Sequence, residues 1–232
     1  VQGATDHAIV AGILPGYLKV PTPEQATLRD HLDASTPTPL VPDTVNYWGN
    51  YPKFLVSQLK AWFGDHATAA NEFGYQYLGK QDGDATWLSI WDQVRQGEVE
   101  GFIALGFNPL LAGPDVPRLL ESMSRLKWKV IIDPFMLDSA EFWRAPGMEP
   151  TEVQTEVMYM PTTHWIERDG SFTNSGRWAQ WKEKAIDPPA GVRSDTYVLS
   201  ELFWRVKELY QQDGEDAVYN EPIQNLTWDY LN

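Results

Sequence analysis

The 232-residue sequence contains no cysteine. Within these residues the chain therefore cannot form a disulfide framework, hold a cysteine-ligated iron-sulfur cluster or offer a thiolate to a metal ion. Positive charge is also scarce, because 18 lysines and arginines stand against 32 aspartates and glutamates, a formal charge of −14. Since proteins bind nucleic acid through clustered lysine and arginine, nucleic acid is disfavoured as a partner.

Long hydrophobic runs are missing as well. No apolar run reaches the roughly 18 to 20 residues that span a bilayer, so we expect no direct membrane insertion. The first six residues, VQGATD, contain neither an initiator methionine nor the basic-then-apolar pattern of a signal peptide. We therefore expect the chain to be an internal piece of a longer protein.

Histidine, which is a common metal ligand, is also sparse. The four histidines are scattered and show no metal-ligand spacing such as H-E-x-x-H; they are His7, His31, His66 and His164. We interpret them as structural or surface residues. The histidine spacing thus predicts no metal site in this chain.

What the sequence does contain is typical of a globular domain with many loops. Hydrophobic residues make up 43% of the chain, with 17 prolines, 17 glycines and 11 tryptophans. The tryptophans fit a carbohydrate site that stacks sugars on indole faces, or packing between domains of a larger protein. The latter is the simpler interpretation, because large amphipathic rings are enriched at buried contacts.

The first part of the chain, 1–98, is predicted to be irregular and helical. Prolines force extended or turn backbone through much of 1–53. Apolar residues at helical spacing predict helices over Phe54–Phe63 and Trp87–Val94, and a short helix over Glu24–His31 is also expected.

The middle part, 99–213, has the pattern of an α/β domain. Short apolar runs at Glu100–Leu105 and Trp128–Asp133 flank a helical pattern over Val116–Leu126, which predicts a βαβ unit with parallel strands. A third strand is expected over Glu156–Met160 and a long amphipathic helix over Thr196–Gln212. We predict an open, mostly parallel sheet with flanking helices, followed by a C-terminal extension over 214–232.

Ligands of open α/β sheets bind at the carboxyl ends of the strands. In this sequence the loops after the three predicted strands carry Asn108, Asp133 and Thr162. Carboxylate and amide oxygens at such a place can accept hydrogen bonds from a nucleobase or from ribose hydroxyls. The alternative is that Asn108 and Asp133 only cap the segments that follow them.

Three strings in order resemble the molybdopterin oxidoreductases of the dimethyl sulfoxide reductase family. They are GFNP at 106–109, VIIDPF at 130–135, and MPTT at 160–163 followed by ERDGSFTNSGR at 167–177. Within that family, QGATD at 2–6, VNYWGNYPKF at 45–54 and GRWAQW at 176–181 resemble the large subunit of respiratory formate dehydrogenases. The resemblance runs over nearly the whole chain and is least specific after about Gly214.

The resemblance implies a segment of an α/β domain that grips a pyranopterin guanine dinucleotide carrying molybdenum or tungsten. It would place Gly106 and Asn108 in the loop at one guanosine and Asp133 against the same nucleoside. Thr162 would occupy the polar position after the next strand, and Asp195 would contact guanine.

Two further residues match recurrent positions of the family. Arg177 could form a bidentate contact with the cofactor diphosphate, and Glu167 lies in the same motif. The alternative is that Glu167 and Arg177 form an internal pair or anchor a loop.

By the same resemblance, the parent subunit would oxidise formate to carbon dioxide. The reacting cysteine or selenocysteine and the iron-sulfur cluster would lie outside this chain, so the isolated chain is expected to be inactive and to retain no cofactor. The implied partners are the rest of the catalytic subunit and an iron-sulfur electron-transfer subunit, and the implied location is the periplasm. Two alternatives stay open, namely another molybdopterin oxidoreductase acting on thiosulfate, polysulfide or an arsenic oxyanion, and a free-standing nucleotide- or carbohydrate-binding module.

Overall fold

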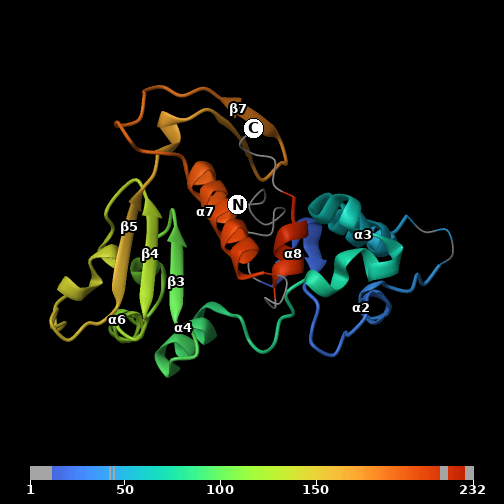
Figure 1. The fold of residues 1–232 in the computed structure, drawn as a ribbon, viewed down its shortest axis with the longest axis horizontal. Coiled ribbons are helices and arrows are strands. Elements are labelled where there is room, and N and C mark those ends of the chain that lie inside the picture. Colours follow the sequence, from blue (N-terminus) through green and yellow to red (C-terminus); the bar gives the residue numbers. More distant parts are fainter. Residues whose placement is uncertain (1–11, 42, 44, 215–218, 228–232) are drawn as a thin grey trace. The chain divides into compact units, whose positions relative to one another are not determined.

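A computed structural model describes residues 12–41, 43, 45–214 and 219–227 (Figure 1). The contacts divide the chain into two compact units. The first contains the described residues up to Gly83, the segment Thr173–Ala179 and the described residues from Ser200 onward. The second contains Asp84–Phe172 and Gln180–Leu199. The sequence predicts three parts, 1–98, 99–213 and 214–232. These domain boundaries stay a prediction.

The first unit is mainly helical. Its elements are the paired strands β1 (Ile13–Leu14) and β2 (Leu18–Lys19), the helices α2 (Leu28–Ser35), α3 (Tyr51–Phe63) and α8 (Asn220–Asn225), and 3-10 helices at Pro15–Tyr17, Tyr47–Asn50, Gly64–His66 and Ala69–Tyr77. Helix α3 packs into the core with one apolar stripe, which includes the buried Leu55, Leu59 and Phe63. It begins one turn before the predicted Phe54, because Pro52 suits the first turn of a helix.

Helix α2 corrects the predicted helix over Glu24–His31. The Thr27 hydroxyl accepts from the Asp30 N–H at 3.1 Å, and the Asp30 carboxylate accepts from the Thr27 N–H at 2.9 Å. This capping box makes Leu28 the first helical residue. On the same helix His31 is fully buried and bonded to Tyr51, so it is a structural residue as predicted.

The second unit is built on a three-stranded parallel sheet, which confirms the predicted fold class. Its strands are β3 (Gly101–Leu105), β4 (Trp128–Asp133) and β5 (Glu156–Pro161), in the order β3-β4-β5. The register aligns Leu105 with Ile132 and Ile132 with Met160. All three strands therefore end at one edge of the sheet.

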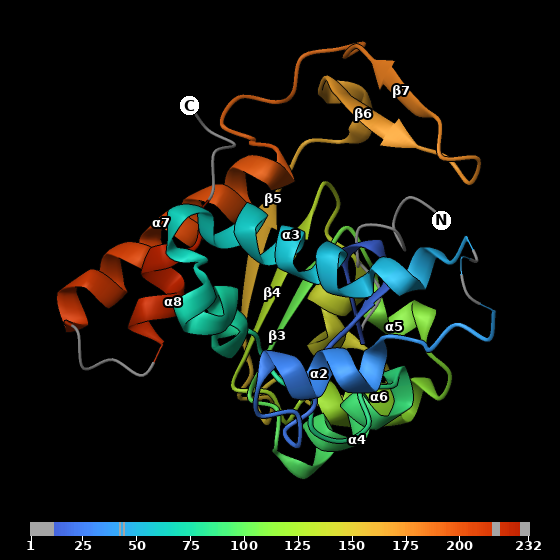
Figure 2. The same ribbon diagram turned by 90° about the vertical axis from the view of Figure 1, so that its right-hand side faces the viewer.

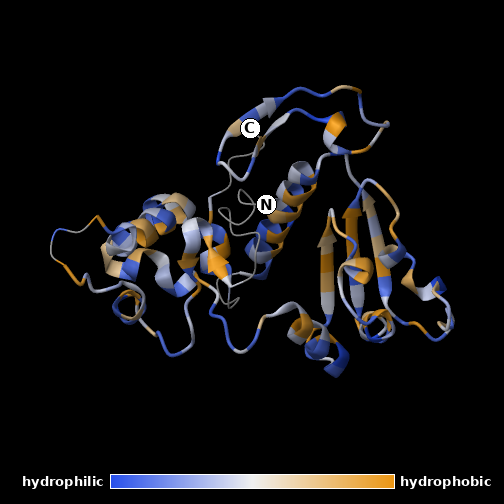
Figure 3. Cartoon of the chain, turned by 180° about the vertical axis from the view of Figure 1, so that it is seen from behind, coloured by the Kyte–Doolittle hydropathy of each residue, from blue (hydrophilic) through white to orange (hydrophobic). Residues whose placement is uncertain are grey.

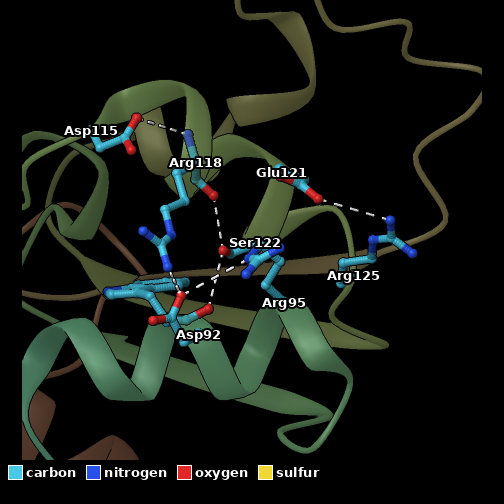
Figure 4. A network of polar contacts seen from close by, with 8 residues as sticks. Asp92, Arg95, Asp115, Arg118, Glu121, Ser122 and Arg125 are labelled. Carbon is cyan, nitrogen blue, oxygen red and sulfur yellow. Dashed lines mark hydrogen bonds and ion pairs between the residues drawn. The ribbon is translucent and has the colours of Figure 1, made fainter.

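Helices α4 (Trp87–Gln96) and α6 (Val116–Met123) form the apolar layer against this sheet, together with the short helix α5 (Pro109–Ala112) and 3-10 helices at Asp138–Ala140 and Phe142–Arg144. Figure 4 shows the polar contacts that join α4 to α6. Arg118 pairs with Asp92, and the Ser122 hydroxyl lies 3.2 Å from the Trp91 carbonyl oxygen. Helix α4 ends at Gln96, and the left-handed conformation of the following Gly97 closes its last turn.

After β5 the chain forms a 3-10 helix at Trp165–Glu167, the strands β6 (Gly170–Thr173) and β7 (Ala179–Lys182), and helix α7 (Asp195–Asp213). Figure 2 shows β6 beside β7, and the two strands pair as a separate two-stranded sheet. Helix α7 confirms the predicted helix over Thr196–Gln212. Among the described residues, no helix is both long enough and apolar enough to cross a membrane.

Candidate functional site

The candidate site is the edge of the parallel sheet where its strands end. Gly106 follows β3 directly, and its N–H donates to the Ile132 carbonyl oxygen at 2.8 Å. Its φ of +60° belongs to the left-handed region, and a Cβ there would meet nothing within 4 Å. One residue after Ile132, at the end of β4, Asp133 pairs with Pro161 at the end of β5. The sheet thus brings the loops that carry Gly106, Asp133 and Thr162 to one edge, as the sequence predicts.

Asp133 lies at the centre of this edge and is buried. Its carboxylate accepts from the Phe135 N–H at 2.9 Å, while its carbonyl oxygen accepts from the Tyr159 hydroxyl at 3.1 Å and from the Thr162 N–H at 3.4 Å. Burial, and then the negative charge of Asp133, raise the pKa of Tyr159. Because two groups from β5 and the residue after it bond the Asp133 carbonyl oxygen, and the Phe135 N–H bonds its carboxylate, Asp133 is held at the strand end.

Asn108 lies one loop away, at the start of α5. Its side-chain oxygen accepts from the Leu110 N–H at 3.2 Å, and its amide nitrogen lies 3.5 Å from a carboxylate oxygen of Asp138. Asn108 therefore caps α5, and Asp133 closes a turn at Phe135. These contacts belong to the capping alternative, and a ligand role for either residue stays a prediction.

Thr162 and Thr163 present a different situation. Both are more than nine-tenths buried, and neither hydroxyl has a hydrogen-bond partner among the described residues. Thr155, which is also buried, bonds its hydroxyl to the carbonyl oxygens of Met123 and Leu126 at 2.9 and 2.8 Å. A buried hydroxyl without a partner costs about 1 to 3 kcal/mol, so such groups are normally satisfied by protein, water or ligand. Thr162 and Thr163 are therefore two unused hydrogen-bonding groups at the strand edge.

The other predicted site residues are less concentrated. Asp195 begins α7 and pairs with Arg168. It is tied to the edge by the backbone, because Thr162 forms a parallel bridge with Arg193. The Glu167 carboxylate accepts a hydrogen bond from the His164 N–H of the same loop at 2.8 Å. Arg177 lies in the segment Thr173–Ala179, which belongs to the first unit, so it is not placed with the other candidates.

Two arginines that the sequence analysis did not single out lie in the second unit near this edge. The Arg193 carbonyl oxygen accepts a hydrogen bond from the Thr163 N–H at 3.0 Å. The Arg193 guanidinium lies 5.4 Å from the centre of the Tyr197 ring. Arg168 is the partner of Asp195. In the sequence, only their positions point to them. Arg168 follows Glu167 directly, and Arg193 comes two residues before Asp195.

Chemically, the edge offers hydroxyls, a buried carboxylate and two guanidinium groups, of which that of Arg168 is already paired with Asp195. Such a set can accept from ring N–H, amine and hydroxyl groups, and it can neutralise a phosphate. Across the described part of the chain, no group of three or more histidine, aspartate and glutamate residues could hold a metal ion. The arrangement is therefore suited to a polar organic ligand with phosphate groups.

Comparison with known proteins shows long and consistent similarity. The chain is 39% identical to the nitrate-inducible formate dehydrogenase major subunit of Escherichia coli and 38% identical to the formate dehydrogenase major subunit of Haemophilus influenzae, in each case over 99% of its length. It is 34% identical, over 98% of its length, to the formate dehydrogenase 2 subunit alpha (cytochrome c-553) of Nitratidesulfovibrio vulgaris. The chain spans only 22–23% of the length of these relatives. No protein-family model matches it.

Proposed function

The chain corresponds to one segment of the formate dehydrogenase major subunits, and we propose that it is the part of such a catalytic subunit that helps hold a pterin guanine dinucleotide. The observation that carries this proposal is the pair of buried, unpartnered hydroxyls of Thr162 and Thr163 beside the buried Asp133. They lie at the carboxyl edge of a parallel sheet, where α/β folds bind nucleotides. The similarity to formate dehydrogenases over 99% of the chain supports the choice of cofactor.

The described residues fit such a group. The Asp133 carboxylate can accept from a ribose hydroxyl or a base N–H, and the two threonine hydroxyls can donate to or accept from the same nucleoside. Arg168 and Arg193 supply positive charge for a diphosphate, a role the sequence analysis gave to Arg177. Asp195 pairs with Arg168, and we expect its carboxylate to accept hydrogen bonds from the guanine edge once Arg168 turns to the phosphates.

A bound molybdenum or tungsten pterin would supply a two-electron acceptor for the oxidation of formate to carbon dioxide and a proton. The residues of this chain bind and orient the cofactor and exclude water from its nucleotide end. The thiolate or selenolate on the metal and the cluster cysteines come from other parts of the subunit, because this chain has no cysteine. The partners we propose are the rest of the catalytic subunit and an iron-sulfur electron-transfer subunit, in the periplasm.

The test is a Thr162→Val substitution in the full-length subunit. Valine keeps the shape of threonine and removes a buried hydroxyl that no described protein group uses, so the variant should fold at least as stably as the wild type. Cofactor retention should fall, because the lost hydrogen bond is made to the ligand. Guanine released by acid and metal bound after dialysis measure the effect.

Thr155→Val is the matched control in the same unit. Its hydroxyl is already satisfied by two carbonyl oxygens, so the variant should lose stability, about 1 to 3 kcal/mol, with no selective loss of cofactor. If Thr162→Val retains full guanine and metal content, the Thr162 hydroxyl does not contact the cofactor.

Asp133→Asn tests the carboxylate separately. An asparagine oxygen can still accept from the Phe135 N–H, so the turn should survive. A hydrogen bond to a charged acceptor contributes about 1.5 to 3 kcal/mol, so cofactor affinity should fall roughly tenfold to a hundredfold. Unchanged cofactor content together with unchanged stability would reduce Asp133 to a turn residue.

A further inference from the structure

The segment 133–139, which we call the β4 loop, runs from the last residue of β4 into the next 3-10 helix and is held at both ends by side chains of the sheet. At its first residue the Asp133 carbonyl oxygen accepts from the Tyr159 hydroxyl at 3.1 Å. At its last residue the Ser139 carbonyl oxygen accepts from the Lys129 ammonium group at 2.6 Å. Lys129 and Tyr159 lie on the same face of the sheet, because Tyr159 pairs with the residue two positions after Lys129.

Lys129 is fully buried, and its contacts are internal to the second unit. Its ammonium nitrogen lies 3.1 Å from the Met123 sulfur of α6 and 5.2 Å from the centre of the Phe142 ring. Met123, Phe142 and Ser139 all belong to the same unit as Lys129. Among the described residues, the Ser139 carbonyl is its one oxygen partner, and no carboxylate pairs with it. Figure 3 shows the three strands of this sheet largely in hydrophobic colours, so a lysine in the central strand is out of character.

Packing alone does not explain a lysine at position 129. Burial of an ammonium group without a counter-charge costs folding free energy, because the protein interior replaces few of its interactions with water. A methionine would fill a similar volume without that cost. What lysine adds is a donor for the Ser139 carbonyl oxygen, so its role lies in what that hydrogen bond fixes.

The bond fixes the 3-10 helix Asp138–Ala140, which borders the candidate site. Ser139 is fully buried, and a carboxylate oxygen of the preceding Asp138 lies 3.5 Å from the Asn108 amide nitrogen. Asn108 in turn caps α5, in the connection that follows β3. A line of contacts therefore runs from Lys129 through Ser139 and Asp138 to the loop after β3.

We infer that Lys129 is a positioning residue for the nucleotide site, because it holds the β4 loop so that Asp133 and Asp138 stay in place beside the loop after β3. This inference rests on the proposed function. Lys129 acts through Ser139 and does not itself touch the cofactor. Since Tyr159 still holds the other end of the β4 loop, removal of the Lys129 ammonium group should loosen the loop without unfolding the sheet.

Lys129→Met in the full-length subunit separates positioning from packing. Methionine keeps the apolar contacts and loses the hydrogen bond, so the cofactor-free variant should melt at the temperature of the wild type or above it. The cofactor should nevertheless dissociate about tenfold faster, as is typical when a residue that orients ligand-binding groups from behind is removed. Thermal melting and the guanine that remains after timed dialysis measure the two effects. Lys127→Met, which removes the exposed lysine directly before β4, is the control and should change neither.

Hydrogen exchange measures the loosening of the β4 loop directly. The amides of Ala140 and Glu141 bond within the 3-10 helix, and in the cofactor-free Lys129→Met variant they should exchange several-fold faster. The amides of α6, whose Met123 also contacts Lys129, should exchange at the wild-type rate. Faster exchange of both segments would make Lys129 a packing residue, and unchanged exchange of both would mean that its hydrogen bond does not hold the loop. Either result overturns the inference.

Asp138→Ala tests the route from Lys129 to the site. If Lys129 acts through Asp138, the double variant should release cofactor no faster than the faster of the two single variants, because residues that act through one another are not additive. Effects that multiply in the double variant would mean that the two residues act separately, which overturns the route.

The proposed function is measured separately, with Thr162→Val. If Thr162→Val releases cofactor faster and Lys129→Met does not, this inference is wrong and the proposed function stands. If neither variant releases cofactor faster than the wild type, the proposed function is wrong, and this inference fails with it.

Discussion

Lys129 is the most unusual residue in the sheet. Its side chain is fully buried, and its ammonium nitrogen donates to the Ser139 carbonyl oxygen at 2.6 Å and lies 5.2 Å from the centre of the Phe142 ring. Among the described residues, no carboxylate forms an ion pair with it. Burial alone lowers the pKa of Lys129 to about 7. Near neutral pH the second unit therefore holds an ammonium group without a counter-charge.

This arrangement predicts a stability that increases with pH. The folded pKa, about 7, lies below the ordinary value of 10.5, so the unfolded chain binds more protons between these values. The penalty is complete below pH 7 and is relieved as pH rises. Between pH 7 and pH 9 we expect the free energy of unfolding to rise by about 2 kcal/mol.

Urea unfolding of the 232-residue chain at both pH values measures this rise. Lys129→Met should abolish it, because methionine does not titrate. Lys127→Met, which removes an exposed lysine two residues earlier, should leave it unchanged. A wild-type chain whose stability is the same at pH 7 and pH 9 would contradict the prediction.

At this scale the sequence predicts positions better than roles. The strand ends locate Asn108, Asp133 and Thr162 correctly, since parallel strands bring their following loops to one edge. Whether an aspartate there caps a turn or binds a ligand depends on distances that the pattern does not contain. Lys129 was missed for a similar reason, because alternation shows that it shares a face with Ile131 without showing that this face is buried.

At the scale of elements, the register of β3 with β4 depends on a glycine. Gly101 is paired with Trp128, and a Cβ at position 101 would overlap the indole ring. Gly101→Ala should therefore displace the ring or the strand and cost about 1 to 3 kcal/mol. Gly170→Ala in β6 is the matched control, because a Cβ there meets nothing within 4 Å. Equal thermal midpoints for the two variants would show that the Trp128 ring can move away from the new Cβ without loss of stability.

The elements that the sequence predicts well share a regular apolar pattern. The strands β3, β4 and β5 and the helices α4, α6 and α7 lie where periodicity placed them. The hairpin of β6 and β7 was not predicted, because most of its side chains are exposed and no apolar alternation marks its strands. Helix α2 begins four residues later than the apolar pattern predicts, because the capping box of Thr27 and Asp30 sets its first residue.

At the scale of the whole molecule, the chain alone should not oxidise formate. The relatives are formate dehydrogenase subunits, but this chain contains no cysteine and spans less than a quarter of their length. By the proposed function, the metal ligand and the cluster ligands lie elsewhere in the subunit. We expect the purified chain, incubated with molybdate or tungstate and cofactor, to reduce a dye with formate no faster than a protein-free mixture.

The full-length subunit, assayed in parallel, is the positive control. Turnover by the 232-residue chain above the protein-free rate would mean that reacting groups lie within it. This prediction depends on the sequence more than on the structure. Its basis is the absence of cysteine, which no arrangement of the other residues changes.

The bond between the Thr163 N–H and the Arg193 carbonyl oxygen closes a loop on itself. The segment between these residues, which includes the hairpin of β6 and β7, starts and ends at the same place on the sheet edge. Since the entropy of closing a flexible loop grows by only about 0.6 kcal/mol per doubling of its length, the loop can lengthen or shorten at little cost to folding. Evolution can therefore vary the length of this excursion beyond Arg168 while the ends of the sheet strands stay the same.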